Sequence, residues 1–273
     1  MPANLARLRS RVERALAGRV VAPFTYRDRK AVETVSSGIP EIDSLVGGWP
    51  RGGLVEICGP ACSGRTSLLV AALAGRTGQG EVCALVDGRD SFDPHSAEAA
   101  GVELDRLLWV RCRNIDQAFR ATDLLLQGGG FGLIALDLSD IPPAIVRYVP
   151  LNTWFRLRRA VEDTPTILMV LGQEAHAGTC ASLALRLELE KASWVSAEMT
   201  CPFAWLLAGL GVRAEMLRSR FEAAQGKNFR GGAFAGTAGI FEVQTIWTIP
   251  EVAVQKGCFI NEPDSKQKNF FRG

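Results

Sequence analysis

The chain has 273 residues, and its 31 Lys and Arg against 29 Asp and Glu give a formal net charge of +2. Hydrophobic residues make up 47 % and charged residues 22 %, enough for a sizeable core and too little net charge for general disorder. No segment has the 18 or more consecutive apolar residues of a membrane span, and the first twenty residues lack the apolar stretch of a secretory signal. We therefore expect a cytoplasmic globular protein and exclude membrane insertion.

The cysteines and histidines argue against a disulfide-stabilised fold and against a zinc or Ser/His/Asp site. The seven cysteines form no CxxC pair and are scattered over apolar segments, which is unlike a disulfide framework. We expect them as reduced thiols in the core. The two histidines, His95 and His176, have no metal-binding partners at ligand spacing, which argues against a zinc site or a Ser/His/Asp hydrolase. We expect both at the surface.

The N-terminal segment, residues 1–34, is predicted to begin with an amphipathic helix. Its apolar residues recur at helical spacing with arginines between them: Leu5, Leu8, Val12, Ala15 and Leu16. A polar, extended stretch follows the helix. Such an arm docks either on its own core or on a neighbouring subunit, and the sequence leaves both open.

From Val35 onward, short apolar strands alternate with helices, as is typical of an α/β fold with a mainly parallel sheet between helices. The predicted strands are Leu54–Cys58, Val82–Asp87, Leu107–Arg111, Gly132–Asp137 and Thr166–Leu171. The predicted helices are Thr66–Ala74, Pro94–Ala100, Asp116–Gln127 and Asn152–Asp163. Asn114, three residues before Gln117, is a capping-box-like start for the third helix, and the glycines at 128–130 end it.

After Ala181 the pattern changes to strand-like runs without regular helices between them, at Leu183–Leu189, Arg213–Phe221 and Ile240–Ile249. We expect these strands to extend the sheet in antiparallel fashion. The core domain is thus predicted over residues 35–250. A glycine-rich loop lies at 226–239, and a flexible tail is expected at 251–273.

The sharpest motif is a phosphate-binding loop that follows a predicted strand and opens a helix. Its residues are Gly59, Pro60, Ala61, Cys62, Ser63, Gly64, Arg65, Thr66 and Ser67. Glycines let backbone N–H groups converge on a phosphate, the helix N-terminus adds positive charge, and the Thr66 hydroxyl is a ligand for Mg²⁺. Asp137, which ends a buried strand, is the matching second Mg²⁺ ligand. The alternative is a Gly/Ser turn without a ligand.

Arg65 stands where such loops carry lysine. Arginine keeps the charge, but a planar guanidinium replaces a compact ammonium. Phosphate binding can survive this change while the geometry of phosphoryl transfer suffers.

Three segments resemble the core of the bacterial RecA recombinase family. They are Val55-Glu56-Ile57-Cys58-Gly59-Pro60 with Ser63-Gly64-Arg65-Thr66, then Val86-Asp87-Gly88-Arg89-Asp90-Ser91-Phe92-Asp93-Pro94, and Ser37-Gly38-Ile39-Pro40-Glu41-Ile42-Asp43. The resemblance implies a RecA-like P-loop core that binds ATP and Mg²⁺. It also implies that Asp93 lies beside the adenine and that Gln173 links the γ-phosphate to a DNA-binding loop.

The chain departs from the family's pattern at functional positions. Arg89 stands at the position of the catalytic glutamate, and Ser96 matches the aromatic residue that stacks on adenine. The loop after Gln173 contains no Lys or Arg, and therefore lacks the cations that hold single-stranded DNA. These departures argue against efficient ATP hydrolysis and against ordinary strand exchange.

A second likeness points to one branch of the family. Residues 154–162 and 181–187 are similar to ImuA-type accessory proteins of SOS mutagenesis, which accompany an inactive Y-family polymerase and a specialised replicative-type polymerase. This likeness implies translesion polymerases or RecA itself as partners.

Two further segments are candidate interaction surfaces. One is a basic stretch with interleaved aromatics that suits a DNA backbone or a protein partner; its cations are Arg213, Arg218, Arg220, Lys227 and Arg230. The alternative is a strand edge protected by charge. The other, with Gln267, Phe270 and Phe271, resembles the peptide that engages the sliding clamp, the alternative being a folded-back terminus.

Together these features predict a RecA-like protein of DNA repair and damage tolerance with a degenerate ATP site. We expect it to act as an accessory module that binds single-stranded DNA and polymerase or RecA-type partners. One alternative is a DNA-dependent ATPase or recombinase in which Asp90 or a neighbouring subunit supplies the missing carboxylate. Another is an ATP-binding regulatory protein on the same fold. Whether the subunits form an oligomer or filament is left open.

Overall fold

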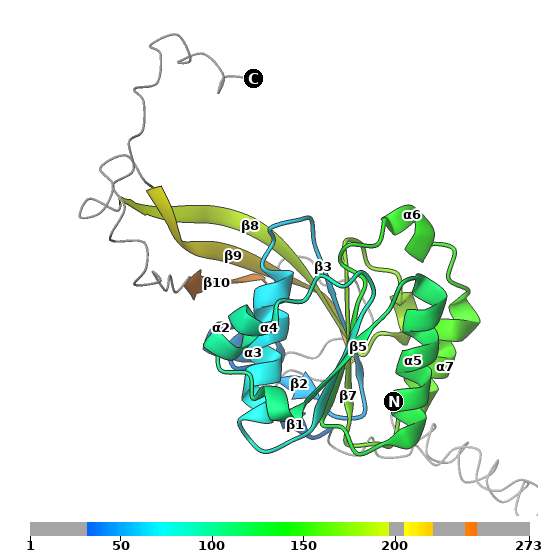
Figure 1. Ribbon diagram of the computed structural model, residues 1–273. Coiled ribbons are helices and arrows are strands. Elements are labelled where there is room, and N and C mark those ends of the chain that lie inside the picture. The colour runs from blue at the N-terminus through cyan, green and yellow to red at the C-terminus, as the bar shows by residue number, and fades with distance from the viewer. Residues whose placement is uncertain (1–31, 197–204, 221–237, 245–273) are drawn as a thin grey trace, which may run out of the picture.

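The computed structural model describes residues 32–196, 205–220 and 238–244. An eight-stranded sheet runs through the molecule in the order β10-β9-β8-β3-β7-β6-β4-β5. Helices α2, α3 and α4 cover one face of this sheet, and α5 and α7 cover the other (Figure 1). The predicted α/β class with a mainly parallel sheet is confirmed.

Five strands of the parallel part of the sheet were predicted, and all are confirmed within a residue of their predicted bounds. They are β3 (Leu54–Cys58), β4 (Cys83–Asp87), β5 (Leu107–Arg111), β6 (Leu133–Asp137) and β7 (Ile167–Gly172). The residues of β3, β4 and β7 are buried throughout, which explains their continuous apolar sequences. Because the strands are parallel, their carboxyl ends meet at one edge of the sheet.

The four predicted helices also lie where the sequence places them. They are α3 (Arg65–Thr77), α4 (Pro94–Ala99), α5 (Ile115–Gly128) and α7 (Leu151–Val161). The Asn114 side chain caps α5 by accepting a hydrogen bond from the Gln117 N–H at 2.9 Å, and the chain leaves the helix at Gly129 with φ +65°.

Several short elements were not predicted. They are α2 (Pro40–Val46), α6 (Pro143–Val146), the 3₁₀ turns η1 (Leu104–Arg106) and η2 (Gly178–Cys180), and the two-stranded sheet of β1 (Thr34–Val35) and β2 (Trp49–Pro50). None of them has an apolar periodicity that stands out from the surrounding sequence.

The remaining strands correct one prediction. β9 (Trp205–Ser219) and β10 (Ala238–Gln244) are antiparallel as expected, but β8 (Leu183–Ser196) runs parallel to β3. Residues 173–182 carry the chain from the carboxyl end of β7 back to the amino end of β3, where the Ser182 N–H donates to the Leu54 carbonyl. The sheet therefore becomes antiparallel one strand later than predicted.

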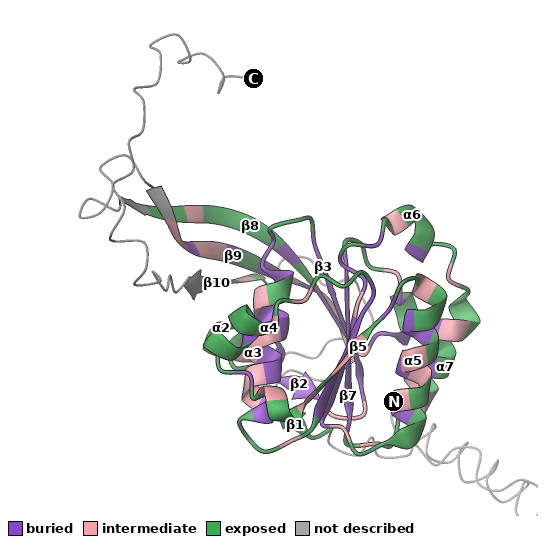
Figure 2. Cartoon of the chain, in the orientation of Figure 1, coloured by how far each residue is buried: buried purple, intermediate pink, exposed green. Residues whose placement is uncertain are grey.

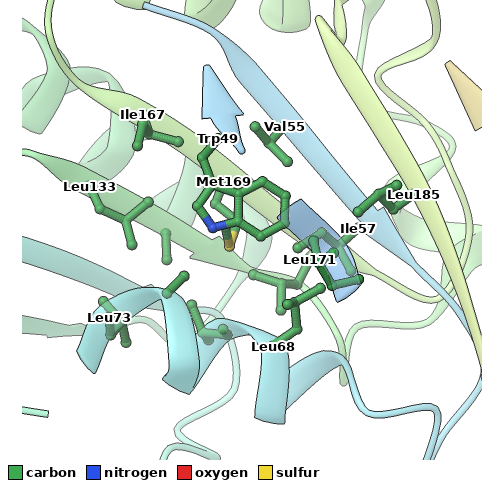
Figure 3. Close-up of a cluster of buried hydrophobic side chains, with 14 of the residues drawn as sticks. Trp49, Val55, Ile57, Leu68, Leu73, Leu133, Ile167, Met169, Leu171 and Leu185 are labelled. Atoms are coloured by element: carbon green, nitrogen blue, oxygen red, sulfur yellow. The ribbon is translucent and has the colours of Figure 1, made fainter. Parts of the chain in front are cut away.

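Two apolar clusters hold the layers together, and the buried residues concentrate on the central strands (Figure 2). On the α3 face, Trp49 is fully buried against side chains of the sheet and of α3, among them Val55, Ile57 and Leu68 (Figure 3). On the opposite face, Phe119 of α5 meets Trp154 of α7 edge to face, with ring centroids 5.1 Å apart.

Some predictions fall outside the described residues and remain predictions: the N-terminal helix, Lys227, Arg230, and the tail residues Gln267, Phe270 and Phe271. Within the described ranges, no helix is long and apolar enough to cross a membrane. Four of the five cysteines described are buried and free as expected, but Cys62 is exposed, because it lies in the loop before α3 rather than in the core.

Candidate nucleotide-binding site

The phosphate loop joins β3 to α3 at the carboxyl edge of the sheet. Gly64 caps α3 with φ +86°, and Cys62 also has a positive φ, +60°. A Cβ on Gly59 would collide with the carbonyl oxygen of Leu187 on β8 and would lie 2.6 Å from the Ser63 Oγ. The loop is therefore folded tightly against the neighbouring strand, and glycine is required at its first position.

Two buried polar groups in this loop have no hydrogen-bond partner among the described residues. The Ser63 side chain is 1 % exposed with an unpaired Oγ, and Arg65 is 7 % exposed with an unpaired Nη1. Burial lowers the pKa of Arg65, and the nearby carboxylates of Asp137 and Asp140 oppose that effect. Because an unpaired buried donor is costly, these two atoms point to an anionic ligand such as a phosphate.

The candidate metal ligands lie on α3 and β6. Thr66 is exposed in the first turn of α3, directly after Arg65, and Ser67 beside it is half-buried. Asp137 ends β6, and its Oδ1 accepts a hydrogen bond from the Ser139 N–H at 2.8 Å. Burial raises the pKa of the Asp137 carboxyl, with Ser139 opposing the shift. A hydroxyl and a carboxylate oxygen suit Mg²⁺, so these residues fit that ion.

Gln173 lies at the same edge of the sheet, immediately after β7. Its side-chain Nε2 donates to the Ser139 carbonyl at 3.0 Å. The residue after β7 is therefore tied to the residues after β6. The structure brings Arg65, Asp137 and Gln173 to one edge, as the motif order predicts.

Asp87, at the end of β4, organises the next loop. Its two oxygens accept hydrogen bonds from the backbone N–H groups of Arg89 at 3.1 Å, Asp90 at 2.8 Å and Phe92 at 2.9 Å. The Trp109 Nε1 donates to the same carboxylate at 3.3 Å. With four donors around it and 1 % exposure, Asp87 holds the loop in place.

The two residues beyond Gly88 differ in their contacts. Asp90 has φ +62°, and both its carboxylate oxygens accept hydrogen bonds from the Arg111 guanidinium, which also lies 5.0 Å from the Trp109 ring centroid. This contact lowers the pKa of Asp90. Arg89 is exposed. Asp90 is thus engaged by Arg111, whereas the side chain of Arg89 is open to solvent.

Asp93 acts as the N-cap of α4. It accepts hydrogen bonds from the His95 and Ser96 N–H groups, both at 3.2 Å, and from the Ser96 hydroxyl. These bonds lower the pKa of its carboxyl, the hydroxyl of Ser96 contributing most. Asp93 and Ser96 thus form one polar cap.

A buried carboxylate that the sequence analysis did not single out lies in the middle of β3. Glu56 is 3 % exposed and accepts hydrogen bonds from the His176 and Ala177 N–H groups, at 2.6 and 2.8 Å. Burial raises its pKa, and these two bonds and the charge of Arg218 oppose the shift. The sequence signal for this buried carboxylate was a single acidic residue between the apolar residues Val55 and Ile57.

His176 corrects a further expectation, since it is half-buried rather than at the surface. Its Nε2 is buried and has no hydrogen-bond partner among the described residues. Burial lowers the pKa of this imidazole, because the charged form is disfavoured there.

Two residues of the predicted basic stretch, Arg218 and Arg220, lie at the end of β9, near enough to Arg158 of α7 for their charges to affect one another. Burial lowers the pKa of Arg220, and the neighbouring charges of Arg158 from α7 and Arg218 lower it further. The Arg220 guanidinium also donates to the Thr179 carbonyl. Arg158 of α7, which also pairs with Glu162 at 3.7 Å, thus lies near Arg218 of β9 and Arg220 just after it. Arg213 lies five residues before Arg218 in β9, and its partner in register on β8 is Glu188.

Comparison with known proteins decides the family. The profile of the RecA N-terminal domain family matches residues 4–144. The chain belongs to the RecA N-terminal domain family. The protein RecA of Acinetobacter baumannii is 34 % identical over 130 residues, covering 47 % of this chain and 37 % of that protein. The protein RecA of Methylobacterium radiotolerans is 37 % identical over 131 residues, covering 47 % and 36 %.

The RecA family membership agrees with the fold. The RadB recombinase structure matches with a TM-score of 0.52 and 20 % identity, covering 68 % of this chain and 90 % of that chain. The match to the curated RecA proteins spans under two fifths of their length.

Proposed function

We propose that this RecA-family chain is an accessory protein of DNA repair and damage tolerance that binds Mg²⁺ and ATP but turns ATP over poorly. Through other surfaces it binds single-stranded DNA and a translesion polymerase or RecA-type partner. Two observations together support this proposal. Ser63 and Arg65 have buried polar atoms without a hydrogen-bond partner, whereas the carboxylates of Asp87 and Asp90 already accept hydrogen bonds within the protein.

Nucleotide binding is supported by the phosphate loop. RecA-like proteins generally bind ATP with Mg²⁺. In this chain the loop N–H groups, Ser63 and Arg65 would hold the phosphates, and Thr66 and Asp137 would hold Mg²⁺. The metal would neutralise charge on the phosphate oxygens. Asp93 is the candidate residue on the adenine side, and Gln173 the candidate sensor of the terminal phosphate.

Poor turnover of ATP is expected because the nearby carboxylates of Asp87 and Asp90 already accept hydrogen bonds from other protein groups. Hydrolysis needs a group that positions and deprotonates water. Asp87 already accepts four hydrogen bonds, and Asp90 is bound to Arg111. The nearby Arg89 is a cation. The competing function, a DNA-dependent ATPase, would require Asp90 to leave Arg111 or a second copy to supply the carboxylate.

DNA binding is assigned to the arginine cluster of Arg158, Arg218 and Arg220. Glu162 pairs with Arg158 at 3.7 Å, and the cluster still holds three cations against this one carboxylate, which suits the phosphates of a DNA backbone. The polymerase partner rests on the likeness of residues 154–162 to ImuA-type proteins.

Equilibrium binding of Mg-ATP tests the nucleotide part of the proposal. Arg65→Ala should weaken binding by about tenfold or more, because a buried charged donor to phosphate is lost. Arg106→Ala is the matched control, since Arg106 is exposed before β5, at the amino edge of the sheet, and should bind normally. Unchanged affinity in Arg65→Ala, or no binding by the natural protein, would contradict the proposal.

A further inference from the structure

The backbone of Arg89 is held close to the end of β6. Asp87 of β4 and Asp137 of β6 are partners in register, and the Gly88 N–H donates to the Asp137 carbonyl at 3.0 Å. A Cβ on Gly88 would lie 2.7 Å from that carbonyl oxygen, so only glycine permits this approach. Arg89 is therefore the next residue after Gly88, whose backbone is bonded to Asp137, the candidate Mg²⁺ ligand at the end of β6.

This position is rigid in its backbone and free at its side chain. The Arg89 N–H is fixed by the Asp87 carboxylate, at 3.1 Å. In the described part of the chain, the Arg89 guanidinium has no ion pair or hydrogen bond, although Asp90 is the adjacent residue. Asp90 is engaged by Arg111, so the acid that could neutralise Arg89 is already used.

The sheet order brings the phosphate loop and Arg89 to the same edge. The loop follows β3, β7 and β6 are the next strands towards β4, and the Gln173 side chain after β7 donates to the Ser139 carbonyl after β6 at 3.0 Å. A triphosphate extends one phosphoryl group further than a diphosphate. A guanidinium can bind that group through two parallel hydrogen bonds.

We propose that Arg89 binds the terminal phosphate of a nucleoside triphosphate held by the phosphate loop, so that the protein distinguishes ATP from ADP without needing to hydrolyse ATP. This inference rests on the proposed nucleotide binding. It assigns Arg89 a role in specificity, with Arg65 holding the phosphates common to both nucleotides.

Dissociation constants for Mg-ATP and Mg-ADP test the inference in the natural protein and in Arg89→Ala, Arg89→Lys, Arg89→Glu and Arg106→Ala. The natural protein and Arg106→Ala should prefer Mg-ATP by about tenfold or more, as expected for one charge-assisted contact. Arg89→Ala should lose most of this preference by weakening Mg-ATP alone, Arg89→Lys should keep part of it, and Arg89→Glu should reverse it.

The outcomes separate the two proposals. Equal affinity of the natural protein for both nucleotides, or equal weakening of both in Arg89→Ala, would overturn the role of Arg89 and leave nucleotide binding standing. Absence of binding of either nucleotide by the natural protein would overturn both. Thermal unfolding of each variant provides the check that Arg89→Ala is folded, because the side chain is exposed and its loss should leave stability nearly unchanged.

Discussion

Arg111 on β5 binds both carboxylate oxygens of Asp90, with Nε 2.5 Å from Oδ1. The contact joins the loop after β4 to the edge strand, and the same guanidinium lies over Trp109. It bears on function because Asp90 is the acid that an ATPase hypothesis would call on.

Asp90→Asn should therefore leave nucleotide turnover at its basal level. The carboxylate is held by Arg111 and is not available to accept a proton from water. Steady-state phosphate release from the natural protein and the variant, at matched nucleotide saturation, measures this. A large loss of turnover in Asp90→Asn would make Asp90 a catalytic residue and support the ATPase hypothesis.

Asp87→Ala should destabilise the protein by about 3 kcal/mol, because three backbone N–H groups and the Trp109 indole lose a buried acceptor. Asp105→Ala is the control, since Asp105 is exposed in η1 and its loss should cost under about 0.5 kcal/mol. Urea unfolding of both variants gives the comparison. Equal stability of the two would show that Asp87 does not organise the loop.

The raised pKa of Glu56 predicts a pH dependence with a definite sign. A carboxyl whose pKa is higher in the folded than in the unfolded state binds a proton more readily when folded. Stability contributed by Glu56 is therefore lost as pH rises from the ordinary value of 4.5 through the raised pKa of the folded protein. Glu56→Gln, which keeps an acceptor for the His176 and Ala177 N–H groups, should flatten this decline.

Urea unfolding between pH 4 and 8 measures that difference. At pH 7 Glu56→Gln should be as stable as the natural protein or more so. Glu56→Ala should be less stable by about 2 kcal/mol, because two buried N–H groups lose their acceptor. Parallel pH curves for Glu56→Gln and the natural protein would contradict the assignment.

Binding to single-stranded DNA should depend on the arginine cluster. The double variant Arg158→Ala/Arg218→Ala should bind more weakly and should lower the slope of log affinity against log salt by about 0.7 for each phosphate contact removed. Arg220 is left in place because it bonds to Thr179. Arg106→Ala serves as the control for loss of positive charge. An unchanged slope in the double variant would move the DNA site elsewhere.

The parallel strands were predictable because each is a short apolar run bounded by polar or glycine residues. Leu54–Cys58 and Leu107–Arg111 coincide with their predicted bounds. The direction of β8 was not predictable, because alternating apolar and polar residues look the same for a parallel and an antiparallel strand. The direction depends on residues 173–182, which carry the chain back to the amino end of β3, so that β8 runs parallel to it. The seven residues of α2 gave too little periodicity.

The phosphate loop was predictable because its chemistry depends on residues adjacent in the sequence. Contacts between separate segments were not. Arg111 and Asp90 are 21 positions apart and meet because β4 and β5 are neighbours, and Glu56 meets His176 across 120 positions. Arg158 likewise lies near Arg218 and Arg220, from which it is far removed in the sequence.

Hydrolysis of ATP by the purified protein, with and without single-stranded DNA at low and physiological salt, tests the central claim most directly. We predict that Mg-ATP binds and that turnover stays near background, with no rise on adding DNA. Robust turnover stimulated by DNA would contradict an accessory role and would require a free carboxylate at the edge where Arg89 now lies.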